Sequence, residues 1–518
     1  MRENNMRIPA WCVFLFGSVL ALHAVADWPA WRGPLQNGMV KDAAMLREAL
    51  PTNAWNAVWE SEPIPGDTEG GFGSPVVADG RVYLFCSWRI WSNVTERCLA
   101  ANKAGELGLV PAGIGDSLLA EIEAARVSPE RAALKGPEVG KWSKDWVAAR
   151  PTVTQQVAVA RFAEDRLSRG EKALPIDGLR MVTQLVGRVF SDQAALVAWF
   201  EQHSLTNSLR DQIDQRIPKK TSRMDDVILC LDAVNGRTLW KKSYPGQASD
   251  WGSSSTPCVA GGRVFVMGSS GMAYGFDART GDLQWTNAVT RQAVNASFAA
   301  QGGKLFILAG QLLALDPATG KVQWTQKAVS GVNASPVMWD HAGKSYVLAG
   351  GSQVACADPD DGKLLWKVPG SDSSTPAVSG DSMAVQYGGG LLIYSLSPTG
   401  AVKVADVKSA GSRGASAVAA DGKAYTTCDG KAVCVDLATG AMVWQVNGTH
   451  EPFASPLLAN GKLVALGAEG KLSLFSAADG RLLGSAKVGS LRCTSPALVG
   501  TRLFVRTGKG VSCYELGP

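Results

Sequence analysis

The chain has 518 residues, and its formal net charge of +5 comes from 51 lysines and arginines against 46 acidic residues. No dense basic run occurs, so a surface that follows a nucleic-acid backbone is excluded. With only four histidines in the chain, we also expect no metal site built from several imidazoles.

The amino terminus has the pattern of a secretory leader. Arg2 and Arg7 precede an apolar run at 8–22, and residues 24–26 (Ala-Val-Ala) supply the small side chains that signal peptidase requires. The run is short for a membrane span, and no second apolar stretch of spanning length follows. The sequence predicts a signal peptide at 1–26 and an exported protein, periplasmic or extracellular, without a transmembrane segment.

A sequence frame recurs about every 40 residues, as in repeat proteins. Its clearest copy is 314–324, Ala-Leu-Asp-Pro-Ala-Thr-Gly-Lys-Val-Gln-Trp, while the copies at 397–404 and 476–484 keep the glycine but lack the tryptophan. Two short alternating apolar runs precede each copy and are joined by a turn dipeptide such as Gly261-Gly262. Period, strand count and turn chemistry together predict the four-stranded blade of a β-propeller.

The number of blades follows from the starts of their first strands. These lie near Pro75, Pro257, Phe298, Pro336, Pro376, Ala417, Pro456 and Pro496. The last unit ends with three strands, and the segment around Trp59 matches the missing fourth strand. We therefore predict an all-β, eight-bladed propeller whose two chain ends pair, so that no sheet edge stays open at the seam.

The repeated tryptophans and glycines are interpreted as packing positions. An indole on a fourth strand can lie on the Thr-Gly turn of the neighbouring blade, where glycine permits close approach and the aspartate bonds the turn amides. The positions assigned to this structural motif are Trp59, Trp240, Trp285, Trp324, Trp366 and Trp444, with Gly236, Gly281, Gly320, Gly362 and Gly440.

Residues 92–224 have a different character, because turn dipeptides vanish and helical spacing appears. Leu118, Leu119, Ile122 and Ala125 follow Asp116-Ser117, and Val182, Leu185, Val186 and Val189 follow Asp177. We predict a mostly helical insertion in the first blade, between 27–91 (closing strand and first half of blade 1) and 225–518 (remainder of blade 1 and blades 2–8). It serves as a cap or packing arm, or as a docking surface or lid.

The frame of 314–324 resembles the tryptophan-docking repeat of the pyrroloquinoline-quinone (PQQ) propeller superfamily, which includes quinoprotein alcohol dehydrogenases and the BamB subunit of the outer-membrane barrel assembly machinery. Residues 28–34, Trp-Pro-Ala-Trp-Arg-Gly-Pro, followed by Gly38, resemble the opening of secreted bacterial members. The resemblance covers roughly 28–90 and 225–518. It implies the fold but not an activity, since one fold hosts catalysts and scaffolds alike.

A quinoprotein dehydrogenase would need a buried quinone over a calcium ion, an aspartate base and, in many members, two adjacent cysteines. No two cysteines are adjacent here, and no Cys-x-x-Cys-His haem motif occurs. We therefore expect no catalytic residues, no metal and no cofactor. PQQ with calcium stays the alternative, because calcium ligands come from scattered loops without a local pattern.

Nine cysteines remain after the predicted signal peptide. Four of them stand two residues before the motif acid, a place that alanine or glycine takes in other blades: Cys230, Cys356, Cys434 and Cys513. A position restricted to small residues is tightly packed, so we expect buried free thiols. A disulfide between Cys428 and Cys434 within one hairpin is the alternative.

The loops that enter the first strands surround the propeller axis and are the expected place for a ligand. Their residues could converge on an anionic or sugar-like molecule: Trp251, Asn295, Asn333, Asp372, Arg413, His450 and Arg492. Asp372 and Arg413 occupy matching places in consecutive blades, which equally fits a structural ion pair.

The sequence thus predicts a non-catalytic, exported scaffold that binds a protein partner, or a ligand, through its loops or its helical insertion. The first alternative is a divergent PQQ- and calcium-dependent quinoprotein dehydrogenase. The second is a propeller glycosidase or lyase, for which Glu69, Asp250 and Glu451 are the candidate acids.

Overall fold

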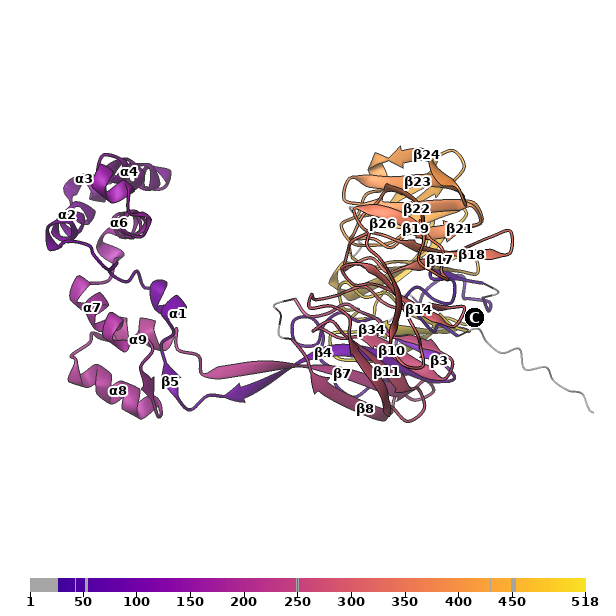
Figure 1. The fold of residues 1–518 in the computed structure, drawn as a ribbon, viewed down its shortest axis with the longest axis horizontal. Helices are drawn as coiled ribbons and strands as arrows, with labels where there is room; N and C mark the ends of the chain where they lie inside the picture. The colour runs from indigo at the N-terminus through magenta and orange to yellow at the C-terminus, as the bar shows by residue number, and fades with distance from the viewer. Residues whose placement is uncertain are drawn as a thin grey trace, which may run out of the picture. The chain divides into compact units, whose positions relative to one another are not determined.

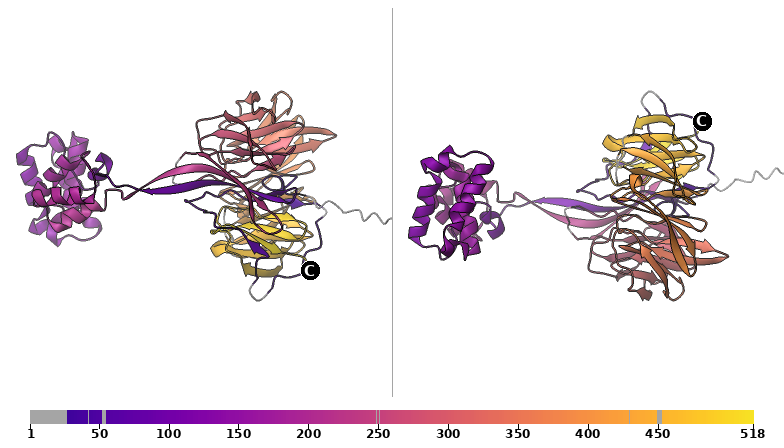
Figure 2. Two further views of the ribbon diagram at one scale, coloured as in Figure 1. Left: turned by 90° about the horizontal axis from the view of Figure 1, so that it is seen from below. Right: turned by 90° about the horizontal axis from the view of Figure 1, so that it is seen from above.

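The computed structural model describes residues 27–41, 43–51, 55–247, 249, 251–428, 430–448 and 453–518. The chain forms two compact units, one of Met1–Arg89 with Met224–Pro518 and one of Ile90–Arg223. Figure 1 shows that the first unit is built of strands and the second mostly of helices, and Figure 2 gives two further views. The expected signal peptide lies outside the described residues. Within them, no helix has the length and apolarity needed to cross a membrane.

Eight sheets with antiparallel neighbours make up the described part of the β unit, and each joins its strands in chain order except where the N-terminal strands β1 and β2 are added to sheets 7 and 8. Sheet 1 contains β3 (Val76–Ala78), β4 (Arg81–Asn93), β7 (Lys220–Asp232) and β8 (Thr238–Pro245), and sheet 2 contains β9 (Cys258–Ala260), β10 (Arg263–Met267), β11 (Met272–Asp277) and β12 (Leu283–Ala288). Sheet 3 contains β13 (Ala299–Gln301), β14 (Lys304–Leu308), β15 (Leu312–Leu315) and β16 (Val322–Gln326), and sheet 4 contains β17 (Val337–His341), β18 (Lys344–Ala349), β19 (Gln353–Ala357) and β20 (Leu364–Pro369).

Sheets 5 to 8 repeat the pattern, with short 3-10 turns at η2 (Lys408–Ala410) and η3 (Ala468–Gly470). Sheet 5 contains β21 (Ala377–Ser379), β22 (Ser382–Tyr387), β23 (Gly390–Ser397) and β24 (Gly400–Val407), and sheet 6 contains β25 (Val418–Ala420), β26 (Lys423–Cys428), β27 (Lys431–Asp436) and β28 (Met442–Asn447). Sheet 7 contains β29 (Leu457–Ala459), β30 (Lys462–Leu466), β31 (Lys471–Ser476) and β32 (Leu482–Lys487), and sheet 8 contains β33 (Ala497–Val499), β34 (Arg502–Arg506), β35 (Val511–Glu515) and β2 (Trp59–Glu60).

Sheet 8 takes its fourth strand from the other end of the chain. Strand β2 pairs antiparallel with β35, with Trp59 opposite Cys513 and Glu60 opposite Ser512. A further N-terminal strand, β1 (Met39–Val40), pairs parallel with β29, the first strand of sheet 7. The N-terminal segment is therefore part of two sheets whose other strands lie more than 400 residues away in sequence.

A circuit of hydrogen bonds joins the eight sheets just before their first strands. In each sheet the backbone N–H of one serine or threonine donates to the side-chain hydroxyl of the equivalent residue in the next sheet, over 2.8–3.1 Å. The sequence of donors and acceptors is Ser74, Thr256, Ser297, Ser335, Thr375, Ser416, Ser455, Ser495 and again Ser74. All eight residues are buried. Because the circuit returns to its first member, the sheets surround a common centre, as in a β-propeller.

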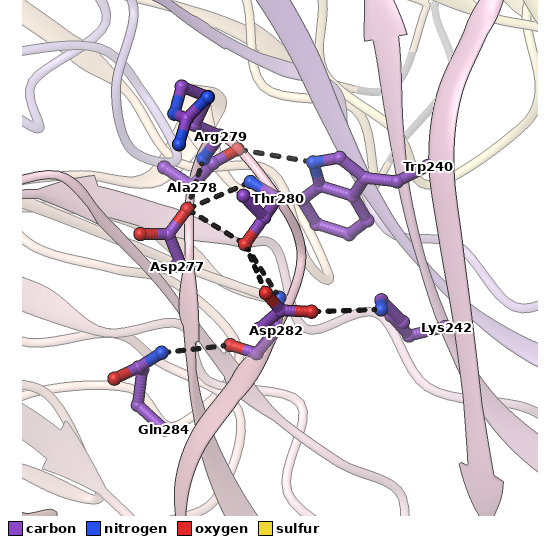
Figure 3. A network of polar contacts seen from close by, with 8 residues as sticks. All are labelled: Trp240, Lys242, Asp277, Ala278, Arg279, Thr280, Asp282 and Gln284. Carbon is purple, nitrogen blue, oxygen red and sulfur yellow. Dashed lines mark hydrogen bonds and ion pairs between the residues drawn. The ribbon is translucent and has the colours of Figure 1, made fainter.

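The outer strands are joined to neighbouring sheets by tryptophans, as Figure 3 shows for one contact. Trp240 Nε1 donates to the carbonyl oxygen of Ala278 over 3.2 Å, and its indole lies on Gly281. Asp277 holds the turn by accepting from the backbone N–H groups of Arg279 and Thr280. Equivalent indole-to-carbonyl bonds are made by Trp59, Trp285, Trp324, Trp366 and Trp444.

The two copies without tryptophan are filled in other ways. In sheet 5 the side chain of Ala405 lies where the indole would be, against Gly440 of sheet 6. In sheet 7 the copy ends at Gly484, and Leu50 of the N-terminal segment packs directly onto it. Leu50 is buried, so the N-terminal segment fills the gap that the missing indole leaves.

Small residues face each tryptophan across the third and fourth strands. Cys230 pairs with Trp240, Cys356 with Trp366 and Gly275 with Trp285. A Cβ on Gly275 would come within 2.4 Å of the Trp285 ring, so this position accepts only small side chains. The nine cysteines among the described residues carry free thiols, including Cys428 and Cys434. Burial raises the pKa of Cys356 to about 12, which makes its thiol unreactive near neutral pH.

The helical unit is reached from the two central strands of sheet 1, β4 and β7. Its elements are β5 (Arg97–Cys98), α1 (Ala101–Gly105), α2 (Asp116–Arg126), α3 (Pro129–Ala133), α4 (Pro137–Ala148), α5 (Pro151–Thr154), α6 (Val157–Arg169), η1 (Gly170–Lys172), α7 (Ile176–Leu185), β6 (Val189–Phe190), α8 (Gln193–Gln202) and α9 (Asn207–Asp214). It has two cores of its own, one around Ile122 and Phe162 and one around Leu185 and Trp199.

The prediction that Val186 and Val189 continue the helix face of Val182 and Leu185 is wrong. Helix α7 stops at Leu185, and Val186 is already extended. Val189 lies in strand β6, where it is exposed and pairs with Cys98. Both valines are β-branched, which favours the extended backbone that the strand provides.

The hydroxyl circuit predicts a stability cost when one hydroxyl is removed. Ser416→Ala leaves the buried N–H of Thr375 without its acceptor, so we expect the free energy of unfolding to fall by about 1–3 kcal/mol. Urea unfolding measures this. Ser330→Ala, at an exposed serine, is the control and should change stability by less than about 0.5 kcal/mol. Equal unfolding midpoints for both variants would show that this hydrogen bond of the circuit does not stabilise the fold.

The tryptophan contact predicts that two glycines with the same backbone angle respond differently to alanine. Gly281 and Gly262 both have φ of 73°, but a Cβ on Gly281 would lie 2.6 Å from Trp240 Cδ2, while Gly262 faces open space. Both variants pay about 1–2 kcal/mol for the left-handed backbone, and Gly281→Ala should lose a further ~1–3 kcal/mol through overpacking. Thermal unfolding of the two variants tests the difference, and equal losses would contradict it.

Candidate functional site

The N-terminal segment occupies the centre of the ring. Trp28 exchanges two backbone hydrogen bonds of 2.8 Å with Val77 of β3. Val259 of β9 donates to the Pro29 carbonyl over 2.7 Å, and Leu458 of β29 donates to the Gly38 carbonyl over 2.9 Å. The segment is thus held by first strands of sheets 1, 2 and 7.

Two polar side chains fasten the same segment to the opposite sheets. Arg32 donates to the carbonyl oxygens of Pro376 and Ala417, which immediately precede β21 and β25. Asn37 Nδ2 donates to Ala419 over 3.2 Å. Arg32 is buried without a carboxylate partner among the described residues, and this burial lowers its pKa to about 9. A buried charge destabilises a fold unless it is hydrogen-bonded, so the buried Arg32 side chain depends on these carbonyl acceptors.

A cavity of about 300 Å³ lies on the axis beside this segment. Half-buried Trp31 lines it, next to buried Arg32. Four hydroxyls of the circuit form part of the wall: Ser74, Ser297, Ser335 and Thr375. Trp251 and Phe453 add two more aromatic rings. The cavity therefore combines flat apolar surfaces with a ring of hydroxyl groups.

An ordered chain of amides stands on one side of the cavity. Asn295 Nδ2 donates to Asn333 Oδ1 over 2.9 Å, and Asn333 Nδ2 donates to Asp372 Oδ2 over 3.1 Å. Asp372 also accepts from the backbone N–H of Val332. The Asp372 carboxylate is thus used to orient the asparagines, and it is not among the residues that line the cavity.

The two arginines near the cavity have different surroundings. Arg492 Nη2 bonds Asp67 Oδ1 over 2.7 Å, and its guanidinium lies 4.9 Å from the ring centre of Trp251. Arg413 lines the cavity and makes no ion pair or hydrogen bond with the described residues. The alternative of an Asp372–Arg413 ion pair is wrong for the described chain, because the Asp372 oxygens accept from Asn333 and Val332 instead.

The structure brings together part of the residue set expected at the mouth. Trp251, Asn295, Asn333 and Arg413 line the cavity, Asp372 lies behind the asparagines, and Arg492 lies beside Trp251. His450 lies outside the described residues, as do Asp250 and Glu451. Glu69, the remaining candidate acid, pairs with Arg89 at 3.7 Å.

Sequence reasoning missed three kinds of residue at this site: Trp31, Phe453 and the hydroxyls. The Trp-Pro-Ala-Trp-Arg-Gly-Pro segment was visible as a motif, but nothing local says that Trp31 reaches the axis. The hydroxyls stand directly before the residues that mark the first strands, six of which are prolines. That repeated Ser-Pro or Thr-Pro pair was the available signal.

The cavity as described does not fit a quinone on a calcium ion. Calcium requires several oxygen ligands, usually with carboxylates among them. None of the described lining residues is acidic, and the described residues contain no group of three or more histidine, cysteine or acidic side chains placed to hold a metal.

Asp226 is a buried carboxylate outside the cavity. Ser269 donates to its Oδ1 from both the backbone N–H, over 3.0 Å, and the hydroxyl, over 2.7 Å. Desolvation raises the pKa of Asp226, and the hydrogen bonds from Ser269 oppose that rise. A perturbed pKa can indicate a functional group, but this side chain is fully enclosed and absent from the cavity lining, so its role is structural.

The chain matches the sequence model of a family described as outer membrane protein assembly factor BamB, over 221–298, 274–424 and 392–513, together more than half of the chain. BamB of Yersinia pestis is 22% identical over 312 residues, which are 55% of this chain and 78% of that protein. Quinoprotein alcohol dehydrogenase PedH of Pseudomonas putida is 27% identical over 173 residues, 29% of each chain.

Among solved structures, BamB from Moraxella catarrhalis aligns with a TM-score of 0.47 and 17% identity, covering 56% of this chain and 90% of that chain. The family match and the sheet topology confirm the expectation of a mostly β, PQQ-repeat propeller.

The buried carboxylate predicts a pH-dependent difference in stability. The raised pKa means that folded Asp226 holds its proton more tightly than the unfolded chain does, so its stabilising contribution is full below about pH 4 and is lost as pH rises through the raised value. Asp226→Asn carries no charge to desolvate and still offers Oδ1 to Ser269. We expect its free energy of unfolding, relative to the parent, to increase from about pH 4 to about pH 7.

Urea unfolding at the two pH values measures this change. Asp360→Asn, at an exposed carboxylate paired with Lys304, controls for the loss of one negative charge. An Asp226→Asn difference that stays constant with pH would show that the carboxylate is ionised normally.

Proposed function

Because the chain belongs to the PQQ-repeat propeller family described as outer membrane protein assembly factor BamB, we propose that it is a non-catalytic binding scaffold for a protein partner. The observation that carries this proposal is a hydrogen-bonded ring of sheets with a separate helical unit connected between two strands of its first sheet. Rigid β-rings commonly present binding elements on their connections rather than perform chemistry.

The proposal includes a single eight-bladed ring with the helical segment, 92–224, as an insertion in its first blade. The closed circuit of hydroxyls supports one ring of eight members. The six indole contacts support tryptophan docking between blades. The pairing of β2 with β35 supports 27–91 as the closing strand plus the first half of blade 1, and 225–518 as the rest.

The helical unit offers a surface suited to a protein. A groove of about 860 Å³ runs along α6 and the segment after α1, with Val110, Val157 and Phe162 on its apolar side. Arg161 and the Asp165–Arg169 ion pair stand at its margin. Apolar centres with charged rims are typical of protein interfaces. Val157 is 80% exposed, which is unusual for a large aliphatic side chain.

We place the protein outside the cytoplasm, in the periplasm or beyond the cell. The leader-like pattern at residues 1–26 supports export, and the matched relatives are named as outer membrane assembly factors. A divergent quinoprotein dehydrogenase stays the alternative, supported by matches to quinoprotein dehydrogenases over about a quarter of their length.

The scaffold role predicts that a charge in the helical groove blocks partner capture. Val157→Glu adds a carboxylate at the first residue of α6, where the helix dipole tolerates it, so folding should persist. We expect recovery of specifically cross-linked envelope proteins by the full chain to fall about tenfold or more, as for a central interface residue.

The matched control is Val402→Glu, at a 71% exposed valine of β24. It should leave recovery unchanged. Equal recovery with both variants would exclude the groove as the docking surface, and turnover of alcohols after adding PQQ and calcium would overturn the non-catalytic role.

A further inference from the structure

We propose that the axial cavity binds a small sugar acid, a six-membered hexuronate. The inference goes beyond the scaffold role and does not rest on it. Its first support is Arg413, an exposed residue of the cavity lining that makes no ion pair or hydrogen bond with any described residue. The described lining contains no carboxylate that would compete with a ligand for this arginine. A guanidinium binds a carboxylate with two parallel hydrogen bonds.

The second support is the balance of donors and acceptors on the wall. The hydroxyl oxygens of Ser74, Ser297, Ser335 and Thr375 already accept backbone N–H groups. Each hydroxyl keeps its hydrogen for donation, since a hydroxyl both accepts and donates. The wall therefore offers donors and needs a ligand rich in oxygen acceptors.

The amide chain has the same bias. The carbonyl oxygens of Asn295 and Asn333 accept from Ser254 N–H and from Asn295 Nδ2. Each Nδ2 group donates one hydrogen bond, from Asn295 to Asn333 and from Asn333 to Asp372, and keeps a second hydrogen. Because Asp372 fixes the orientation of the chain, these hydrogens are held in place before a ligand arrives, which reduces the entropy cost of binding.

The third support is the aromatic surface. Trp31, Trp251 and Phe453 all line the cavity. Phe453 packs against the backbone of Gly414, where a Cβ would approach its ring to 2.4 Å. Trp251 is held against Phe72, with ring centres 5.0 Å apart. The flat apolar face of a pyranose ring has the shape that such indole and phenyl surfaces cover.

Together these features select one ligand class. Inorganic phosphate would use the cation and the donors but not the three rings. An aromatic acid would use the cation and the rings but would accept few hydrogen bonds from the hydroxyl and amide groups. A hexuronate has a carboxylate, several oxygen acceptors and one apolar face. The cavity, at about 300 Å³, is at the small end of ligand pockets and suits a monosaccharide.

The test is titration of the full chain with D-galacturonate, followed by calorimetry and by the fluorescence of the cavity tryptophans. Galactose lacks the carboxylate, and benzoate lacks the hydroxyls. We expect galacturonate to bind at least about tenfold more tightly than either. Arg413→Gln should weaken galacturonate about tenfold or more. Arg279→Gln, at an exposed arginine on the turn of sheet 2, is the matched control and should leave binding unchanged.

Each other result overturns the proposal. Galacturonate that fails to bind at millimolar concentration, or binds no better than galactose, would exclude a sugar-acid site. Binding that survives Arg413→Gln would place the ligand elsewhere. Binding of PQQ in the absence of galacturonate binding would assign the cavity to the quinone. The Val157→Glu capture experiment is unaffected by any of these outcomes, so the two proposals fail separately.

Discussion

Eight buried hydroxyl groups, each accepting the backbone N–H that stands before a neighbouring sheet, hold the centre of this protein together. At these positions the backbone turns into a first strand and has no ladder partner of its own. Proline follows in six of the eight sheets, and because proline has no N–H, no second donor needs an acceptor there. One hydroxyl per sheet therefore provides an acceptor for each buried backbone N–H at the centre. If one sheet were missing, a buried N–H donor would be left unpaired.

The N-terminal segment depends on the same arrangement. It enters the centre that the first strands enclose and bonds sheets 1, 2, 5, 6 and 7 through Trp28, Pro29, Arg32, Asn37 and Gly38. Further along, Leu50 packs on Gly484, and Trp59 completes sheet 8. One stretch of chain thus lines the axial cavity, fills a missing indole position and closes the ring. Contacts between such distant parts of the sequence carry a large loop-closure cost, which the ring recovers through burial of the segment.

The helical unit has apolar cores of its own. It buries two apolar cores inside 90–223 and contributes no residue to the axial cavity. Its groove and the cavity consequently differ in chemistry: the groove is apolar with charged margins, while the cavity is rich in hydrogen-bond donors.

Local sequence patterns are enough to predict many of the turns and strands of this protein. Turn dipeptides such as Gly261-Gly262, the aspartate that bonds its own turn at Asp277, and the alternation of the flanking strands all act within a few residues, so they can be read from short windows. The same is true of the small residue opposite each indole, which explains the cysteines at Cys230 and Cys356. The break of α7 at Leu185 shows the limit of this approach, because the periodic apolar spacing continues into a strand.

The partners of the site residues depend on the curvature of the whole ring. Ser495 and Ser74 are 421 positions apart in sequence, yet they share a hydrogen bond. Trp31 reaches the cavity only because five sheets hold its segment on the axis, and Asp372 turns to Asn333 rather than to Arg413. Serine and threonine are too common for eight of them to stand out in a sequence. Their convergence, and the position of Arg413 beside them, arise only when all the sheets are assembled around one centre.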